Sequence, residues 1–317
     1  MILIFDFVIF CEVKMKNLEQ YIISHFQSGA YVGSEDGSGA YENALGWTDN
    51  AVAPSLIFSH RSTPYTRESF TEGLHNHDFY ELLIYVDGDI EYIKDDTVIR
   101  PQKYSAIWFT PGQMHTARLL SPSRYERYVI YFYEDFFSTE NGQTPITDFI
   151  GKGADISFDE ETKRSVVRLL ESVKSTLASD ANYRNLLARA YLTELFAALN
   201  ESCAPRHEYE KIDGDMARVK RYIDEEYATI ENTSSLAEKF YYSREHLSRR
   251  FCAEFNITLH DYLAKRRINE SLPYLETGSV AQASYAVGFH SQSAYISAFV
   301  KNMGCLPSEY KRRIFGI

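Results

Sequence analysis

The chain has 317 residues, which is enough for two domains that each bury a core. Its formal net charge of −11 argues against a uniformly basic, nucleic-acid-binding surface, so the distribution of charge along the chain matters more than the total. The cysteines have no paired spacing, which argues against a disulfide framework or a zinc–cysteine site and favours a reducing compartment, the cytoplasm; they are Cys11, Cys203, Cys252 and Cys305.

An apolar extension, residues 1–16, begins the chain. Residues 1–11 are almost wholly apolar, but they are too short to span a bilayer, lack the positive start of a signal peptide and contain Asp6. We therefore expect no membrane partner. Three interpretations stay open: a strand packed on the first domain, a short anchor, or translation from upstream of a true start at Met15.

Residues 17–158 are predicted to form a domain of strands. Runs of β-branched and aromatic residues at 82–86, 90–93, 106–109 and 128–133 are separated by turn signals such as Asp87-Gly88-Asp89. Many short strands of this kind indicate a sandwich or a barrel. Residues 17–49 are rich in Gly, Ser and Tyr, as a mobile lid over a pocket would be, although this composition suits any loop.

The hydrophobic period changes to about 3.6 after Asp159, which predicts a pair of helices over residues 159–203. The predicted buried stripes are Val166, Leu169, Leu170, Val173 and Leu177 in the first helix, and Leu187, Tyr191, Leu195 and Phe196 in the second. Residues 179–182 are the predicted turn between them, and residues 204–214, with Pro205 and several charges, the predicted linker. We expect the helix pair to support dimerisation.

Residues 215–317 carry two copies of one helical pattern, Leu-Ser-Arg-Arg-Phe at 247–251 and Tyr-Ile-Ser-Ala-Phe at 295–299. Each sets two large apolar residues four apart and follows a short helix-turn signal. Two compact helices joined by a tight turn make a helix-turn-helix, whose second helix can enter the DNA major groove. Residues 211–317 contain 15 basic and 13 acidic residues, so DNA affinity must come from local clusters at 244–250, 265–267 and 311–313.

The polar faces of the two helices are the candidate base-reading surfaces. Steps of 100° place Leu247, Phe251 and Phe255 on one side of the first helix, and the polar residues on the other. Arg249 could donate two hydrogen bonds to O6 and N7 of a guanine, and Glu245 could accept a hydrogen bond from N4 of a cytosine. The alternative is an ordinary helix face that only contacts solvent.

The second helix has no charged residue before Lys301, so we expect it to bind phosphates less strongly than the first. The candidate DNA-binding residues are Arg244, Glu245, His246, Ser248, Arg249, Gln292, Ser293, Ile296, Ser297 and Lys301.

Residues 217–313 resemble the DNA-binding domain of the AraC/XylS family of bacterial transcription regulators. The resemblance rests on residues 243–251, Tyr262 with 267–268, residues 287–289, Phe299 and the closing Gly-Cys-Leu-Pro-Ser-Glu-Tyr at 304–310. It implies two helix-turn-helix units joined by a long helix, each reading one of two adjacent major grooves. Its base-facing positions map onto Glu245, Ser248 and Arg249, and onto Gln292, Ser293, Ile296 and Ser297.

Several positions depart from that family's pattern. Ser297 stands where many members place Arg, and Val300 and Cys252 stand where many place Lys. These losses suggest that the second unit clamps the DNA backbone more than it reads sequence. Pro273 lies within the bridging helix, where a proline removes a hydrogen bond and is expected to kink the helix.

The N-terminal domain contains His75, His77, Glu81 and His115, whose types suit Fe, Mn, Ni, Cu or Zn. Residues two apart on a strand share a face, so the first two imidazoles can converge. The spacing resembles the metal motif of the cupin barrel, although Ser69 stands where a Gly usually precedes the motif. Three interpretations stay open: a functional metal, a structural His77–Glu81 pair, or direct contact with an effector.

Together these patterns predict an α+β protein: a cupin-like β-barrel with a helix pair, followed by an all-α tandem helix-turn-helix domain. The predicted function is a sequence-specific transcription regulator, not an enzyme, that binds double-stranded DNA as a homodimer, with RNA polymerase as a further candidate partner. The resemblance implies a sugar or sugar derivative as effector. The rivals are a metal-responsive regulator and a metal-dependent cupin enzyme. No cofactor is required, though a divalent transition metal would fit. The candidate effector-binding residues are His75, His77, Glu81, Tyr85, Trp108 and His115.

Overall fold

The computed structural model describes residues 56–66, 73–133, 136, 158–201 and 210–315, and the backbone of the strands within residues 32–53. The predicted extension, residues 1–16, lies outside the described residues, as does most of the predicted lid. The strands are β1 (Val32–Gly33), β2 (Ala40–Glu42), β3 (Thr48–Ala53), β4 (Leu56–Tyr65), β5 (Tyr80–Asp87), β6 (Ile90–Lys94), β7 (Thr97–Ile99), β8 (Ala106–Phe109), β9 (His115–Leu119), β10 (Ser123–Phe132) and β11 (Glu210–Lys211).

The strands form two antiparallel sheets that face each other. The seven-stranded sheet has the order β1-β2-β3-β4-β10-β5-β8, and the four-stranded sheet has the order β11-β7-β6-β9. The runs predicted at 82–86, 90–93, 106–109 and 128–133 are confirmed as β5, β6, β8 and the end of β10. Among the described strands the sheets do not close into a complete barrel, so the cupin-like domain is an open form of the predicted one.

The two faces of strand β10 pack in two different hydrophobic clusters. Successive side chains of a strand point to opposite faces of the sheet. Tyr125, Val129 and Tyr131 therefore belong to the cluster between the sheets, whereas Tyr128 and Ile130 belong to the cluster that packs against the helix pair. This alternation decides which residues can reach the interior of the domain.

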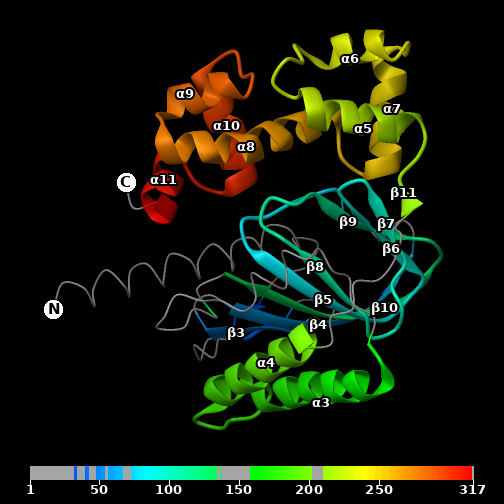
Figure 1. The fold of residues 1–317 in the computed structure, drawn as a ribbon, viewed down its shortest axis with the longest axis vertical. Helices are drawn as coiled ribbons and strands as arrows, with labels where there is room; N and C mark the ends of the chain where they lie inside the picture. The colour runs from blue at the N-terminus through cyan, green and yellow to red at the C-terminus, as the bar shows by residue number, and fades with distance from the viewer. Residues whose placement is uncertain are drawn as a thin grey trace, which may run out of the picture.

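The helix pair covers the outer face of the seven-stranded sheet (Figure 1). Helix α3 (Glu160–Leu177) begins at Asp159, whose side chain accepts a hydrogen bond from the Thr162 amide at 2.8 Å. The predicted stripe of α3 is confirmed as buried. In the predicted stripe of α4 (Arg184–Glu201), Leu195 and Phe196 are buried and Tyr191 packs against the same cluster, but Leu187 is 45% exposed and Ala188 packs in its place. Leu186 and Leu187 give α4 an exposed apolar side as well as its buried one.

The C-terminal residues form seven helices, as the tandem helix-turn-helix prediction requires. Helices α6 and α7 make the first unit, α9 and α10 make the second, and α8 joins them (Figure 1). Helix α8 runs unbroken through Pro273, so the predicted kink does not end the helix. No described helix is both long and apolar enough to cross a membrane. The helices are α5 (Asp215–Glu226), α6 (Thr233–Lys239), α7 (Arg244–Phe255), α8 (Leu259–Thr277), α9 (Val280–Ala286), α10 (Gln292–Met303) and α11 (Pro307–Phe315).

Part of the predicted linker, residues 204–214, is built into the fold instead. Residues 210–211 form β11, which pairs antiparallel with β7. The next residue, Ile212, is buried, and its amide donates to the Asp96 carbonyl at 2.9 Å. The prediction missed this because a two-residue strand has no sequence period of its own. It forms because the edge of β7 offers free hydrogen-bonding groups.

Candidate nucleic-acid interface and ligand pocket

Helix α7 presents the predicted reading face to solvent. The Ser243 hydroxyl accepts from the His246 amide at 3.2 Å and starts the helix. Leu247, Phe251 and Phe255 are buried on the inner side. On the outer side Arg244, Glu245, His246 and Arg249 are exposed and Ser248 is half-buried. The exposed side of the helix therefore carries both a cation and an acceptor, the two kinds of group that pair with base edges.

Helix α10 has the same construction but a less polar face. Tyr295 and Phe299 are buried, and Gln292, Ser293 and Ser297 are exposed. The predicted contact Ile296 is half-buried and packs against the core of the second unit, so only part of that side chain can face DNA. Lys301 is exposed, and its ammonium lies 2.5 Å from a carboxylate oxygen of Asp261.

The bridging helix sets the spacing of the two recognition helices. Its 19 residues span about 28 Å at 1.5 Å per residue, close to the roughly 34 Å of one DNA turn. Arg267 is buried in this helix and donates to the carbonyls of Tyr227 at 2.9 Å and Ile230 at 2.5 Å. These bonds fasten α8 to the loop between α5 and α6, directly before the first unit.

The turn of the second unit comes very close, at Gly288, to the loop between α5 and α6. This glycine has φ +85°, and a Cβ atom there would lie 2.3 Å from the Ala228 carbonyl oxygen. No side chain fits so close to a backbone atom, so glycine is required at this position. The two helix-turn-helix units therefore hold a defined relative placement.

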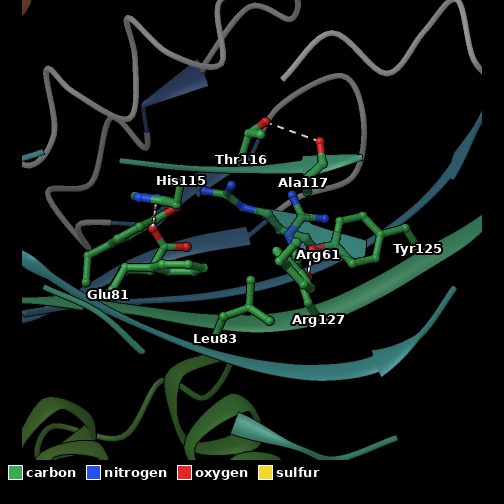
Figure 2. A pocket seen from close by; sticks show the side chains of 11 residues that line it. Arg61, Glu81, Leu83, His115, Thr116, Ala117, Tyr125 and Arg127 are labelled. Carbon is green, nitrogen blue, oxygen red and sulfur yellow. Dashed lines mark hydrogen bonds and ion pairs between the residues drawn. The ribbon is translucent and has the colours of Figure 1, made fainter. Parts of the chain in front are cut away.

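A small pocket lies between the two sheets of the N-terminal domain (Figure 2). Its polar side chains come from different strands: Arg61 from β4, Glu81 from β5, His115 from β9 and Arg127 from β10. All four have less than a tenth of their surface exposed. Its aromatic lining is Tyr92, Phe109, Tyr125 and Tyr131.

Three histidines at one side of the pocket share one orientation. Each Nδ1 lies within hydrogen-bond distance of a backbone carbonyl: His75 to Gly73 at 2.8 Å, His77 to Phe79 at 2.7 Å, and His115 to Gln113 at 2.9 Å. A carbonyl only accepts, so Nδ1 carries the ring proton in each case. The remaining nitrogen, Nε2, is left for another partner. This is the usual arrangement of histidines that hold a metal through Nε2.

The Glu81 carboxylate faces two of these Nε2 atoms, His77 at 3.0 Å and His115 at 3.3 Å. Burial alone would raise the pKa of Glu81, but hydrogen bonds from His115 and His77 outweigh it and hold that pKa well below its usual range. Burial lowers the pKa of His77 despite its hydrogen bond to Glu81. Because Nδ1 of His77 already donates to the Phe79 carbonyl, a second hydrogen bond from its Nε2 to Glu81 requires the doubly protonated ring, which burial disfavours.

The structure brings together His75, Glu81 and His115, whose ligand atoms lie within 4.8 Å of one another, and His77 touches the same carboxylate. It does not bring in Trp108, which packs on the opposite face of the sheet against Phe196 at 5.6 Å between ring centroids. The hydroxyl of Tyr85 bonds to the Gly88 carbonyl, and Tyr85 does not line the pocket. Of the predicted effector-binding residues, Glu81 and His115 line this pocket, whereas Trp108, Tyr85, His75 and His77 do not.

Two pocket residues, Arg61 and Arg127, were missed by the sequence analysis. Neither of them belongs to a recognisable motif in its strand. The available signal was strand alternation, because Arg127 falls on the same face of β10 as Tyr125 and Tyr131.

The segment 73–77 joins the pocket to the DNA-binding domain. His75 pairs with His115 through two backbone hydrogen bonds of 2.9 and 2.8 Å, while the neighbouring Leu74 amide donates to the Phe255 carbonyl at the end of α7 at 3.1 Å. Asn76 donates to the Asn269 side chain of α8 at 2.5 Å. The same short segment thus pairs with the pocket residue His115 and touches both a recognition helix and the bridging helix.

Buried charge reinforces this contact between the domains. Lys220 of α5 is 1% exposed, and its ammonium lies 2.8 Å from both Asp96, in the β6–β7 turn, and Asp224. Arg118 of β9 binds Glu254 of α7 at 3.2 Å. Leu74, Ile93 and Met114 of the strand domain are buried in one cluster with residues of α5 to α8. The two domains are therefore packed on each other through apolar as well as polar contacts.

Two family models match the chain. The AraC-like ligand binding domain matches residues 57–196, and a helix-turn-helix domain matches residues 236–313. The first covers the strands around the pocket and most of the helix pair, and the second covers both helix-turn-helix units.

Curated relatives match over part of their length. The Msm operon regulatory protein of Streptococcus mutans is 30% identical over 134 residues, which is 41% of this chain and 48% of that protein. The HTH-type transcriptional regulator YijO of Escherichia coli is 32% identical over 97 residues, which is 30% of this chain and 34% of that protein. The chain thus spans between a third and a half of the length of these relatives.

Among solved structures, ToxT from Vibrio cholerae is similar over 82% of this chain and 98% of its own, with 13% identity and a TM-score of 0.33. The matched models cover both the ligand-binding and the DNA-binding part, and the named relatives are regulators. The chain belongs to the AraC family of transcriptional regulators and joins an AraC-like ligand-binding domain to a helix-turn-helix DNA-binding domain.

Proposed function

We propose that the protein binds operator DNA through α7 and α10 and that a small-molecule effector in the strand-domain pocket changes this binding. The observation that carries the proposal is segment 73–77, in which His75 pairs with the pocket residue His115 and Leu74 hydrogen-bonds to the end of α7. An effector that fits one placement of this segment better than another would bind the two states of the protein unequally. Unequal binding is what shifts the population toward one state.

A sugar or sugar derivative is the proposed effector. The pocket combines aromatic rings, such as Tyr92 and Tyr131, with buried polar groups, such as Arg127 and His115. Aromatic faces pack on the apolar faces of sugars, and buried charged groups bind hydroxyls. In this proposal the protein is a regulator and has no catalytic role, like the regulators among its relatives.

The proposed assembly is a homodimer in the cytoplasm, where the regulator meets the chromosome and RNA polymerase. Helix α4 supports the dimer because its large apolar side chains lie on the surface: Tyr183, just before the helix, is 72% exposed and Leu186 is 65% exposed. Exposed apolar groups gathered on one element mark a surface for another protein. Two copies would place four recognition helices on two operator half-sites.

A metal-responsive regulator is the second candidate function. The specific observation in its favour is the shared orientation of His75, His77 and His115, which leaves each Nε2 toward the Glu81 side of the pocket. His75, Glu81 and His115 would hold a divalent transition metal, with His77 beside the same carboxylate. When bound, such an ion supplies a positive centre that can accept oxygen atoms of an effector. The donor set fits Fe, Mn, Ni, Cu or Zn.

Replacement of Arg249 by alanine tests the DNA-reading face. We expect Arg249→Ala to lower the affinity for a specific operator by roughly 1–3 kcal/mol, because a bidentate contact to guanine is lost. Binding would be measured on host genomic fragments that the wild-type protein retains at near-physiological salt. Arg164→Ala, which removes an exposed arginine from α3, is the matched control. Equal operator binding by folded Arg249→Ala and wild-type protein would overturn the assignment.

Metal titration tests the second candidate. Chelator-treated wild-type protein should bind one equivalent of Zn²⁺ or Ni²⁺ in calorimetry, and His115→Ala should weaken this binding at least about tenfold, because a ligand is lost. The control is His60→Ala, since His60 also contacts a carboxylate, Glu126 at 2.9 Å, but lies outside the metal cluster. Unaltered metal binding by His115→Ala, or none by the wild type, would contradict the metal site.

A charged substitution on α4 tests the dimer. Leu186→Glu should shift the sedimenting species from dimer to monomer, because a buried unpaired carboxylate is costly. The exposed polar residue Ser175 on α3 provides the control substitution Ser175→Glu. A Leu186→Glu protein that still sediments as a dimer would show that this side of α4 is not the interface.

A further inference from the structure

We propose that Tyr241, in the turn between α6 and α7, contacts the DNA backbone and donates a hydrogen bond from its hydroxyl to a phosphate oxygen. The first helix-turn-helix unit then has a backbone contact in its turn that the second unit lacks. This inference rests on the proposed binding of operator DNA and adds to it a residue outside the predicted reading faces.

The turns of the two units have the same backbone construction. The Tyr242 amide donates to the Ala237 carbonyl at 2.9 Å, and the matching bond in the second turn, from the Phe289 amide, is 3.1 Å. The residue before each of these donors is left-handed, with φ +60° at Tyr241 and φ +85° at Gly288. Helices often end in this way, and the position usually holds glycine because glycine has no Cβ atom. The first unit thus has a tyrosine where the turn itself favours glycine.

Packing within the chain does not account for this tyrosine. Tyr241 is 97% exposed, and its side chain has no hydrogen bond, ion pair or ring contact with the part of the chain that the structure describes. Tyr104 is also left-handed, at φ +65°, but it is half-buried and the Lys163 ammonium lies 5.3 Å from its ring centre. The neighbouring Tyr242 donates to Asp215 at 2.6 Å. Strained positions cluster at functional sites, so an unpacked tyrosine at such a position points to a contact outside the chain.

The place of the turn indicates DNA as the partner. In a helix-turn-helix complex the start of the second helix enters the major groove and the first helix crosses the backbone, so the turn lies beside the phosphates. Ser243, Arg244 and Glu245 are exposed and follow closely, so Tyr241 borders the predicted reading face. The other end of α7, at Phe255, contacts the strand domain, and Figure 1 shows α6 on the side away from the sheets. The strand domain therefore leaves this turn open to a duplex.

The chemistry of tyrosine suits a phosphate contact that adds no charge. A phenolic hydroxyl is a donor, and tyrosine is among the side chains that bind the DNA backbone in this way. The second unit cannot make the same contact, because a Cβ atom at Gly288 would lie 2.3 Å from the Ala228 carbonyl oxygen. Phosphate contacts position a protein on DNA and carry no base information. We therefore expect Tyr241 to strengthen binding to every sequence equally.

The test is DNA binding by full-chain variants, measured on a retained genomic fragment and on a scrambled duplex of the same length. Tyr241→Phe removes the hydroxyl alone, and Tyr241→Gly removes the whole side chain. We expect each variant to bind both duplexes about tenfold more weakly, because a hydrogen bond to a charged group is lost. The dependence of affinity on salt should stay that of the wild type, because a neutral side chain releases no counterions.

Thermal unfolding separates this role from a structural one. Tyr241→Gly should raise the melting temperature of the free protein by roughly 2–4 °C, because glycine adopts the left-handed conformation without strain. Weaker DNA binding by a more stable protein is the loss of a contact with DNA. Tyr104→Phe is the matched control, since Tyr104 has the same backbone conformation but lies in the strand domain, and it should bind both duplexes like the wild type.

The outcomes separate this inference from the function on which it rests. Wild-type affinity of both Tyr241 variants would overturn the contact and assign the exposed ring to a protein partner. Weakening by Tyr241→Gly alone would keep the contact but assign it to the ring, and weakening on the genomic fragment alone would contradict a backbone contact. If the wild type retains no fragment while Tyr241→Phe weakens binding to the scrambled duplex, operator binding fails and the contact stands. A wild-type protein that binds neither duplex would overturn both.

Discussion

The close approach of Gly73 to the end of α7 is the constraint on which the coupling of the two domains depends. A Cβ atom at Gly73 would lie 2.4 Å from the Asn256 carbonyl oxygen, so only glycine lets the strand domain come this near. The same approach brings the Leu74 amide to the Phe255 carbonyl. It also leaves His75 paired with His115 at the pocket. The hydrogen bond to the recognition helix and the hydrogen bonds to His115 of the pocket are therefore made by two adjacent residues, Leu74 and His75.

The hydrogen bonds continue from this point to the bridging helix. Asn269 of α8 accepts from Asn76 at 2.5 Å and donates to the Gly112 carbonyl at 3.2 Å, while the Gly112 amide donates to the His77 carbonyl at 2.8 Å. A shift of His77 would thus act on α8, which spaces the two recognition helices. Couplings between sites are typically worth 1–3 kcal/mol, about the net worth of a few such hydrogen bonds.

Periodicity in the sequence predicted the elements with the strongest amphipathic pattern. The buried side of α3 and the two faces of α7 follow from it, because side-chain burial there repeats with the backbone. Strand β5 is buried on both faces, and its continuous apolar run and the turn after it predicted it instead. Leu187 was placed wrongly because α4 is apolar on more than one side, so its buried stripe cannot be chosen by pattern. In the proposed dimer the second apolar side would be covered by the partner. The sequence pattern of one chain does not distinguish residues buried within the chain from residues buried between two chains.

The pocket was only half predictable for a different reason. His75, His77 and Glu81 lie close in sequence, so their spacing alone suggested a common site. Arg61 and Arg127 meet because β4 pairs with β10, a register set by contacts between distant strands. The sequence also does not show which face of β8 Trp108 points to. That face is set by the pairing of β8 with β5, in which Trp108 lies opposite Leu82, and both side chains pack toward the helix pair.

Hydrogen–deuterium exchange with and without a selected genomic DNA fragment tests the coupling most directly, since linkage between sites is reciprocal. Protection of α7 and α10 would report that DNA is bound. The account predicts that exchange in segments 73–77 and 110–116, at the pocket, then changes as well. Unchanged exchange in these two segments while α7 and α10 become protected would contradict the coupling of pocket and DNA-binding helices.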